Sequence, residues 1–417
     1  MSTARARAAL EPVDLEELSE TGLITVTGES AAPEYRLRPH AHLLLAGDGS
    51  RSQDADVVSA FTGSSMKLER LTPRGSGRSM LEVGTGSGVV ALLAAAHFEQ
   101  VTATDVNPRA LMFAGFNAAL NDIANLELLE GSWFEPVAGR RFDLIVSNPP
   151  YVVSPDRAFT YRDSGLPGAA LLEHLIKPAA EHLEPGGLAI VLFSWPHESE
   201  DDWASAPTAA VAGTGCDALI LGTEAIDPFE YAVRWNSPPV SFMAPDALRD
   251  TVARWLGYYR AIGAGAISYG TIVLRRRTHG TPWVSTLKTH GDAGERAADQ
   301  LIAMIAGRDL LEEVDEPALL ARRFSLPDGV DISQRFQRRQ ERFVARPAMV
   351  RLEGGLGVSA AIDPDALDVL FACDGRRTLS EVIERVAQRR GADVQHMRQM
   401  GTAAVHELLT HGLLQGA

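Results

Sequence analysis

The chain has 417 residues, of which 45% are hydrophobic and 22% charged, a composition typical of folded globular proteins that excludes wholesale disorder. Its formal net charge of −15 disfavours sequence-independent binding of nucleic acid, because such binding depends on neutralising phosphates with Lys and Arg. The length predicts two or three domains.

Neither a membrane span nor a signal peptide is recognisable. No run approaches the roughly 18 consecutive apolar residues of a transmembrane helix, and the first residues lack the apolar core of a signal peptide. Cys216 and Cys373 lie in apolar segments of different predicted domains, where free thiols behave as small buried hydrophobes. We therefore expect a cytoplasmic protein without a disulfide, a metal site or a membrane partner.

Residues 1–70 contain too little apolar sequence for an independent domain. An acidic amphipathic stretch at Asp14–Glu20 precedes a strand-like run at Leu23–Thr27. We expect this segment to be a small N-terminal cap that packs on the following core or covers its cleft.

Residues 71–277 alternate short apolar runs with helical segments, the pattern of an α/β domain with a largely parallel sheet. Asn107-Pro108 reads as an N-cap followed by proline at the first helical position, which supports the helix that begins there. The seven predicted strands are Met80–Val83, Val101–Asp105, Leu126–Leu129, Phe142–Ser147, Leu188–Phe193, Ala218–Leu221 and Gly270–Leu274.

A glycine-rich turn follows the first of these strands. In Leu81-Glu-Val-Gly-Thr-Gly-Ser-Gly88 the glycines permit close backbone approach to a ligand at the carboxyl edge of the sheet. Asp105 ends the second strand, where a carboxylate can accept both hydroxyls of a ribose. NAD would suit the same arrangement, but the G-x-G-x-x-G spacing typical of dinucleotide enzymes is absent, so we favour S-adenosylmethionine.

A second motif, Ser147-Asn-Pro-Pro-Tyr151, ends the fourth strand. A nitrogen conjugated to a π system is a poor nucleophile and must be held for reaction. The Asn148 carbonyl and the backbone carbonyl of Pro149 can accept its N–H groups, while Tyr151 stacks on the planar substrate; positioning then supplies most of the rate. As an isolated feature Asn-Pro-Pro would be merely a turn, but beside a cofactor turn it favours a methyl-acceptor site.

Two nearby features are weaker candidates for substrate contacts. Tyr161 and Arg162 belong either to a solvated loop, which we favour, or to a lid in which Arg162 pairs with a substrate carboxylate. Trp195 ends the fifth predicted strand and so faces the same edge of the sheet.

The C-terminal part divides into a linker with helices at 278–347 and a compact domain at 348–417. Helices are expected at Glu295–Ile305 and Glu316–Phe324. In the last domain Pro364–Ala372, a helix capped by the Thr378/Glu381 capping box and Val394–Leu409 give three helices with flanking strands. The pattern weakly resembles a winged helix or the peptide-binding PqqD-like fold.

An arginine-dense run at Arg335–Arg346 interleaves arginine with phenylalanine. Such a run can grip RNA or an acidic partner by charge and stacking. It is equally typical of an amphipathic helix with a solvated arginine face, and in an acidic chain we favour the helix.

Three stretches carry a resemblance to a known family: Asp105-Val-Asn-Pro-Arg-Ala110, Gly131-Ser-Trp-Phe-Glu-Pro136 and Phe142-Asp-Leu-Ile-Val-Ser-Asn-Pro-Pro-Tyr151. Their order resembles that of class I S-adenosylmethionine-dependent methyltransferases, and within them of the HemK/PrmC-type protein-glutamine N5-methyltransferases. Phe159-Thr-Tyr-Arg-Asp-Ser-Gly165 and Thr214-Gly-Cys-Asp217 extend the resemblance to an actinobacterial group of multidomain HemK-like proteins.

The resemblance implies a role for each matching residue. Glu82 would lie near the methionine end of the cofactor, Asp105 would hold the ribose and Trp133 would lie beside the adenine. Ser132 stands where the family more often has an aspartate, and the family's five-helix substrate-docking module is not recognisable in residues 1–70. The implied cofactor-binding set is Glu82, Gly84, Thr85, Gly86, Gly88, Asp105, Val106, Ser132, Trp133 and Asn148, and the implied acceptor set is Asn148, Pro149, Pro150 and Tyr151.

The sequence therefore predicts a Rossmann-like, seven-stranded methyltransferase core with an N-terminal cap and a mostly helical, winged-helix-like C-terminal domain. A homodimer is compatible with this organisation. Its expected activity is methyl transfer to a planar nitrogen in a protein, a peptide or a small metabolite. Two alternatives remain open: methylation of an exocyclic amino group in a nucleic-acid base, and a non-catalytic module that binds the cofactor or a peptide.

Overall fold

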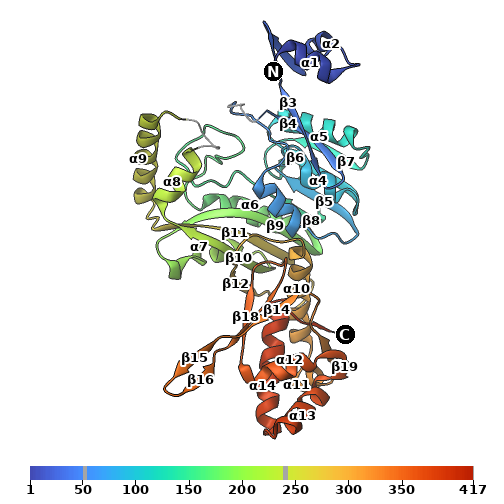
Figure 1. Ribbon diagram of the computed structural model, residues 1–417, viewed down its shortest axis with the longest axis vertical. Helices are drawn as coiled ribbons and strands as arrows, with labels where there is room; N and C mark the ends of the chain where they lie inside the picture. Colours follow the sequence, from blue (N-terminus) through green and yellow to red (C-terminus); the bar gives the residue numbers. More distant parts are fainter. Residues whose placement is uncertain (50–53, 238–242, 417) are drawn as a thin grey trace. The chain divides into compact units, whose positions relative to one another are not determined.

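The computed structural model describes residues 1–49, 54–237 and 243–416 (Figure 1). The chain forms two compact units. The first comprises Met1–Glu69 and Arg74–Thr286, and the second comprises Arg70–Pro73 and Leu287–Ala417. This division differs from the expected boundaries, because the N-terminal segment and the core share a unit and most of residues 278–347 belong to the C-terminal unit.

The sheet of the first unit has the order β12-β10-β11-β9-β8-β5-β6-β7. The five neighbouring strands β9, β8, β5, β6 and β7 pair in parallel, whereas β11 runs antiparallel to both β9 and β10. All seven expected strands are present, and six are longer than predicted. They are β5 (Gly77–Val83), β6 (Phe98–Asp105), β7 (Leu126–Glu130), β8 (Phe142–Ser147), β9 (Leu183–His197), β10 (Cys216–Ile226) and β11 (Ala266–Arg276).

An eighth strand, β12 (Val284–Lys288), occupies the edge beside β10. The sequence predicts a linker here, because the surrounding residues are rich in Gly, His and Thr. The strand alternates exposed and half-buried side chains, as befits an edge strand, and its position depends on pairing with β10 rather than on its own apolar content.

Helices on one face of the sheet enclose the main hydrophobic core. Apolar residues of α6 (Ala170–Glu181) and α7 (Ser205–Val211) pack on inward-facing residues of β5, β8, β9, β10 and β11. Elsewhere, α4 (Val89–Ala94) and α5 (Pro108–Leu120) contact β5, β6 and β7. Asn107 caps α5 and Pro108 begins it, as expected. The carboxyl ends of β5, β6 and β8 thus lie at one edge of a rigid sheet.

A separate cluster of aromatic side chains surrounds the loop that follows β8. It joins Val152 and Val153 to α8 (Pro228–Asn236) and α9 (Pro245–Ala261), two helices inserted between β10 and β11. Tyr231 and Trp255 in these helices are completely buried. This cluster forms a wall next to the second sequence motif.

The N-terminal segment has two parts. Helices α1 (Thr3–Leu10) and α2 (Leu15–Glu20) with strands β1 (Ile24–Thr27) and β2 (Ser30–Pro33) share a small apolar cluster of their own. The hairpin of β3 (Tyr35–His40) and β4 (Leu43–Asp48) packs on α5, where the Asn117 side chain exchanges hydrogen bonds with the Ala46 backbone at 2.7 and 3.1 Å. A third helix, α3 (Gly63–Leu71), follows and leads into the core.

The second unit has its own core. It contains the long helix α10 (Ala297–Glu313), the short α11 (Glu316–Leu320) and two small sheets, β19-β13-β20 and β14-β17-β18. Helices α12 (Leu367–Ala372), α13 (Leu379–Arg390) and α14 (Val394–Thr410) confirm the three expected helices, and Thr378 and Glu381 form the expected capping box. The strands are β13 (Arg323–Ser325), β14 (Val330–Ser333), β17 (Ala348–Leu352), β18 (Ser359–Ile362), β19 (Asp374–Thr378) and β20 (Gln415–Gly416).

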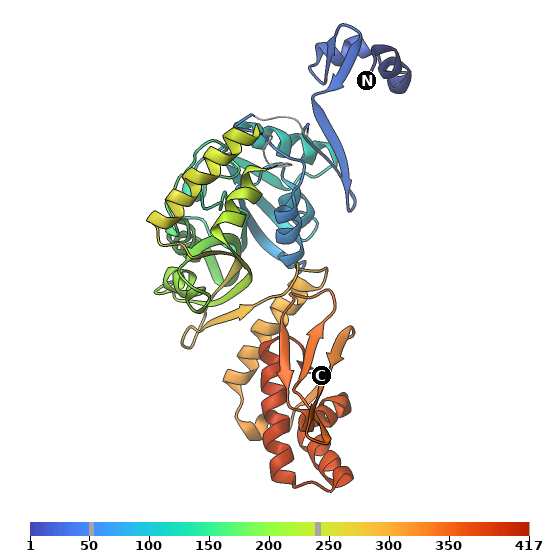
Figure 2. The ribbon, with the colours of Figure 1, turned by 60° about the vertical axis from the view of Figure 1, so that its left-hand side comes forward.

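The arginine-dense run is not a helix. It forms a two-stranded hairpin of β15 (Phe336–Arg339) and β16 (Arg342–Ala345), drawn in orange in Figure 1. The amphipathic-helix prediction was wrong. Over so short a run, the spacing of the arginines and the β-forming residues fits the period of a strand as well as that of a helix. Figure 2 shows the second unit from another side.

Three further observations bear on the sequence expectations. Cys216 and Cys373 are both free and buried. Burial raises the pKa of the Cys373 thiol to about 11, which makes it unreactive at neutral pH. No helix within the described residues combines the length and the apolar character needed to cross a bilayer.

Candidate active site

The glycine-rich turn connects β5 to α4, and backbone hydrogen bonds hold it in place. The Gly84 and Thr85 N–H groups donate to the Thr104 carbonyl at 2.9 and 3.0 Å, which ties the turn to β6. Gly84, Gly86 and Gly88 all have positive φ angles, between +57° and +86°, a region that L side chains rarely adopt. The sequence thus folds locally into a turn that only glycine tolerates without strain.

The space around these glycines differs along the turn. A Cβ added at Gly84 or Gly86 would meet no atom within 4 Å, so the turn borders open space. At Gly88 a Cβ would come within 3.1 Å of the Ala114 side chain, so this glycine serves helix packing instead. The first two glycines therefore form a cradle whose open side can admit a ligand against bare backbone.

Asp105 lies at the end of β6, next to this cradle. One of its carboxylate oxygens accepts the Gly86 N–H at 2.9 Å and the other accepts the Asn107 N–H at 2.9 Å. Burial raises the pKa of Asp105, and these backbone hydrogen bonds oppose the shift. The carboxylate is fixed in orientation, and each oxygen keeps a lone pair with which it can accept a ribose hydroxyl.

Glu82 lies beneath the turn and is 3% exposed. One carboxylate oxygen accepts hydrogen bonds from the Thr85 hydroxyl at 2.7 Å and from the Ala91 N–H in the first turn of α4 at 2.9 Å. Burial raises the pKa of Glu82 to about 8. Its visible hydrogen bonds are structural, since they hold the turn and the start of α4; the role at the methionine end of a cofactor stays a prediction.

A tight turn after β7 carries the expected adenine-side residues. The Gly131 N–H donates to the Asp105 carbonyl at 3.1 Å, which brings this turn to the end of β6. Trp133 has a φ of +50°, unusual for a bulky residue, and its ring meets His174 edge-on at 5.7 Å. Ser132 is half-buried, whereas Val106 is 57% exposed beside Asp105. All of these residues therefore gather at one edge of the sheet.

Asn148 follows β8 at the same edge. Its side-chain Nδ2 donates to the Ser64 hydroxyl at 3.0 Å, whereas its Oδ1 is buried and has no hydrogen-bond partner. A buried carbonyl without a partner is costly, by about 1–3 kcal/mol. Such an atom is a ready acceptor for an N–H group that arrives with a substrate.

Tyr151 completes the motif. Its backbone carbonyl accepts the Ser194 hydroxyl at 2.7 Å, and its ring meets Tyr269 edge-on at 6.4 Å. Burial raises the pKa of the Tyr151 phenol, a shift opposed by a hydrogen bond with the Ser64 hydroxyl. Pro149 is buried and Pro150 is half-buried between these two residues. Ser64 therefore touches both polar side chains of the motif.

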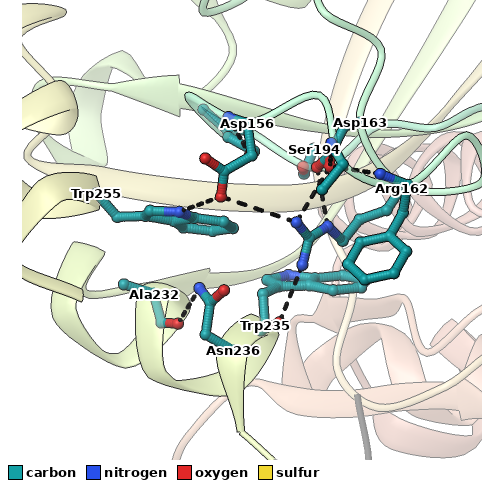
Figure 3. A network of polar contacts seen from close by, with 12 residues as sticks. Asp156, Arg162, Asp163, Ser194, Ala232, Trp235, Asn236 and Trp255 are labelled. Carbon is teal, nitrogen blue, oxygen red and sulfur yellow. Dashed lines mark hydrogen bonds and ion pairs between the residues drawn. The ribbon is translucent and has the colours of Figure 1, made fainter. Parts of the chain in front are cut away.

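The favoured interpretation of Arg162 as part of a solvated loop is wrong, because its side chain is buried (Figure 3). Its side chain is 2% exposed and forms two hydrogen bonds to the Asp163 carboxylate, at 2.8 and 3.1 Å, and one to the Trp235 carbonyl at 3.3 Å. The guanidinium also lies over the rings of Phe159 and Trp255. A group so committed cannot pair with a substrate carboxylate, and the prediction of that pairing is corrected.

The Arg162 network instead fixes the loop that carries Tyr151. The backbones of Tyr151 and Asp163 form an isolated antiparallel β-bridge, and the Val152 N–H donates to the Arg162 carbonyl at 3.2 Å. Asp156 in the same loop accepts the Trp255 indole N–H at 2.8 Å (Figure 3). The loop is therefore fastened to α9 and holds Tyr151 in place.

The structure separates the other two candidates for a substrate contact, Tyr161 and Trp195. Tyr161 is 46% exposed and packs against Phe159, so it remains available to a substrate. Trp195 is fully buried in the main core, and its indole N–H donates to the Trp203 carbonyl at 2.6 Å. The prediction of a substrate contact for Trp195 is corrected, because its side chain alternates to the α6 and α7 face of β9 instead of pointing to the open edge.

Sequence reasoning missed three residues at this edge: Ser64, Tyr231 and Tyr269. Ser64 comes from α3, 84 residues before Asn148. Tyr231 receives the Val153 N–H at 3.1 Å and stacks on Tyr269 at 5.6 Å. No local pattern distinguishes these residues from ordinary polar or core positions, and only the folding of the chain brings them to this edge.

The glycine cradle and the fixed Asp105 carboxylate suit a nucleoside cofactor with vicinal hydroxyls, and the orphaned Asn148 carbonyl suits an N–H acceptor beside it. S-adenosylmethionine fits these donors and acceptors. Among the described residues no group of three or more His, Cys, Asp and Glu side chains is arranged to hold a metal ion.

Comparisons with known proteins agree with this arrangement. Residues 61–198 match the model of the methyltransferase small domain, and residues 302–416 match a family described as a domain of unknown function. The release factor glutamine methyltransferase of Xylella fastidiosa (strain Temecula1 / ATCC 700964) is 39% identical over 140 residues, which cover 31% of this chain and 50% of that protein. Its counterpart in Salmonella typhimurium is 37% identical over 128 residues, covering 28% and 46%.

The chain thus spans about half the length of the curated relatives that it matches. Among solved structures, a methyltransferase from Pyrococcus furiosus aligns over 52% of this chain and 85% of its own, with 19% identity and a TM-score of 0.32.

The family match covers the glycine turn, Asp105 and the Asn-Pro-Pro-Tyr motif together. The strand order of the sheet, with an antiparallel strand between β9 and β10, is that of the Rossmann-like methyltransferase fold. Residues 61–198 therefore match the methyltransferase small domain, and the comparisons support a Rossmann-like, HemK-like methyltransferase domain whose cofactor is S-adenosylmethionine.

Proposed function

We propose that this protein methylates the side-chain amide nitrogen of a glutamine in a protein or peptide. The relatives are release factor glutamine methyltransferases, which supports glutamine as the acceptor group. Because the chain spans only about half of their length, the proposal extends to the amide and not to a particular acceptor protein.

The observation that carries the proposal is the state of the Asn148 amide. Its Nδ2 donates to Ser64 while its Oδ1 is buried without a partner. A primary amide in the site would bring two N–H donors. One would donate to Oδ1, and the other would donate to the backbone carbonyl of Pro149.

S-adenosylmethionine supplies an electrophilic methyl group on a sulfonium sulfur. The residues of this chain contribute by positioning the acceptor nitrogen. With both N–H bonds held in one plane by Asn148 and Pro149, the nitrogen lone pair projects perpendicular to that plane, and the half-buried ring of Tyr151 limits the amide to that orientation. Fixing the reacting atoms in this way can supply several kcal/mol of the barrier.

The proton balance requires no charged base. After the methyl group is transferred the amide nitrogen carries one proton too many and is strongly acidic, so that proton leaves to water. Asn148, Ser64 and Tyr151 are neutral at physiological pH, since burial raises the pKa of the Tyr151 phenol further above its usual value. The site therefore favours a neutral acceptor that is activated by orientation.

The experiment uses the full chain, S-adenosylmethionine with a labelled methyl group, and a lysate separated into protein, nucleic-acid and small-molecule fractions. We expect label in the protein fraction and its recovery as N5-methylglutamine after proteolysis. Asn148→Ala should reduce incorporation by about 10³-fold, as loss of a group aimed at the reacting atoms does. Its cofactor affinity, measured by calorimetry, should stay within about two-fold because Asp105 and the glycine turn are untouched. A larger loss of affinity would instead assign Asn148 to the cofactor-binding set that the resemblance implies.

Label in the nucleic-acid or small-molecule fraction alone would refute the glutamine proposal. Retained activity in Asn148→Ala would refute the acceptor-holding role. The variant Asn148→Gln controls for chemistry, because it keeps the carboxamide but displaces it by one methylene; it should be as inactive as the alanine variant if position decides the rate.

A further inference from the structure

The β15–β16 hairpin is an exposed basic element. Residues 335–346 contain five arginines and one glutamate, a formal charge of +4 within a chain of −15. All five arginines are exposed, and among the described residues none of them has a carboxylate within ion-pair distance. In Figure 1 the hairpin projects from the rest of its own unit.

The hairpin also exposes two phenyl rings. Phe336 is 60% exposed and Phe343 is 72% exposed, and neither ring contacts another aromatic ring in the described structure. Exposed phenyl rings of this extent are unfavourable in water and are normally buried on folding or on binding.

The strand register places the rings and a cation together. Phe336 pairs with Ala345 and Arg338 pairs with Phe343, and directly opposed residues of an antiparallel pair share a face. One face therefore presents Phe336, Arg338 and Phe343. The two rings are diagonal neighbours, which lie roughly 7–8 Å apart at their Cα atoms. Arg339 and Arg342, which also oppose each other, lie on the other face near the turn.

Arginines alone would have a simpler explanation. Charged side chains on a free hairpin keep its edges from pairing with another chain. Exposed phenyl rings work against that purpose, since they make association easier. The combination on one face points to a partner that uses both kinds of side chain.

We propose that the β15–β16 hairpin binds single-stranded RNA, with bases stacked on Phe336 and Phe343 and phosphates held by the flanking arginines. Single strands offer alternating planar bases and phosphates, the chemistry that basic grooves with aromatic platforms recognise. Guanidinium groups suit it better than ammonium groups, because they bind phosphate in a bidentate manner and stack on bases. A peptide whose side chains are all carboxylates would neutralise the arginines but leave both rings in water.

The test uses fluorescence anisotropy of the full chain with a 5′-fluorescein-labelled oligouridylate of 12 nucleotides. Phe336→Ala and Phe343→Ala should each weaken binding by about five-fold or more, the loss expected for one stacked base. Arg338→Gln with Arg339→Gln should weaken binding and reduce the slope of log affinity against log salt by about 0.7 for each lost phosphate contact.

Matched controls separate the hairpin from charge in general. Arg5→Gln with Arg249→Gln removes the same charge from two exposed positions elsewhere and should leave the affinity within about two-fold. Phe343→Trp keeps a stacking surface and should retain binding. Because the hairpin side chains belong to no core cluster, all variants should keep the unfolding temperature and cofactor affinity of the parent.

Three results would overturn the proposal: no binding at 50 mM salt, unchanged affinity in both phenylalanine variants, or displacement of the RNA by a 12-residue polyglutamate as effectively as by unlabelled oligouridylate. The last result would assign the hairpin to acidic peptides. Each outcome is independent of the methyl acceptor, since it requires no catalytic turnover.

Discussion

The two halves of the active-site edge are built in opposite ways. The cofactor half draws the turn from Gly84 to Gly88 and Asp105 from a short continuous stretch, and it is held mainly by backbone hydrogen bonds. The acceptor half joins Asn148 and Tyr151 to Ser64, Ser194 and Tyr269 through side-chain contacts between distant segments. Cofactor geometry is thus encoded locally, whereas acceptor geometry depends on the whole core.

This difference predicts that the two halves tolerate substitution differently. A turn whose glycines have positive φ angles allows few substitutions. Aromatic walls such as α8 and α9 can vary in sequence and still support the loop after β8. The following variants should affect one half and spare the other.

The largest effect is expected from Arg162→Ala in the acceptor half. The change removes one partner of a buried ion pair and leaves the Asp163 carboxylate uncompensated, so the free energy of unfolding should fall by about 3–5 kcal/mol in urea titrations. The neighbouring exposed Arg157→Ala should cost less than about 0.5 kcal/mol. If Arg162 acted on a substrate, its loss would instead raise KM and leave stability unchanged.

Next in size is a pH effect from Glu82 in the cofactor half. The pKa of Glu82 is raised from 4.5 to about 8, so between these values the folded protein holds a proton that the unfolded chain has released. This contribution to stability is full below about pH 4.5 and is lost as pH rises through about 8.

Glu82→Gln keeps the acceptor oxygen and removes the titration. The variant should flatten the decline in unfolding free energy between pH 6 and 8.5, with a gain of about 3 kcal/mol or less over the parent at the alkaline end. Above about pH 8, where the Glu82 carboxyl is ionised, the same variant should bind the cationic cofactor more weakly than the parent does. A parent whose stability rises with pH over this range would show that Glu82 is ionised in the folded protein.

Asp105→Ala should weaken cofactor binding by about 10- to 100-fold, because hydrogen bonds to a charged group are worth about 1.5–3 kcal/mol. Calorimetry measures the change, with Asp246→Asn on the exposed start of α9 as the control. The Kd for the acceptor should be unaffected. Unchanged cofactor affinity would remove Asp105 from the cofactor half.

The smallest effect is expected from Ser64→Ala. The change frees the Asn148 amide to rotate without removing it, so kcat should fall by about five- to ten-fold while cofactor affinity is retained, consistent with the loss of one neutral hydrogen bond. The adjacent Ser65→Ala is the matched control, since Ser65 bonds only within its own turn. Recovery of kcat in Ser64→Thr would mark Ser64 as a positioning residue.

Several elements were predictable because their causes are local. The seven strands followed from apolar runs, α5 from Asn107 and Pro108, and α13 from the Thr378 capping box. Others were not. β12 lacks an apolar run and exists because β10 offers a free edge, and the arginine-dense run fits a strand period as well as a helical one.

The sequence by itself determined the cofactor half, which consists of glycines with positive φ and a carboxylate at the next strand end. It also placed the Asn-Pro-Pro-Tyr motif of the acceptor half at the same sheet edge. Only the tertiary structure decided which side chains surround that motif. It withdrew Arg162 and Trp195 into the core and supplied Ser64 from an earlier helix. The physical reason is that backbone conformation is set by neighbouring residues, whereas burial and hydrogen-bond partners are set by segments that meet only when the chain is folded.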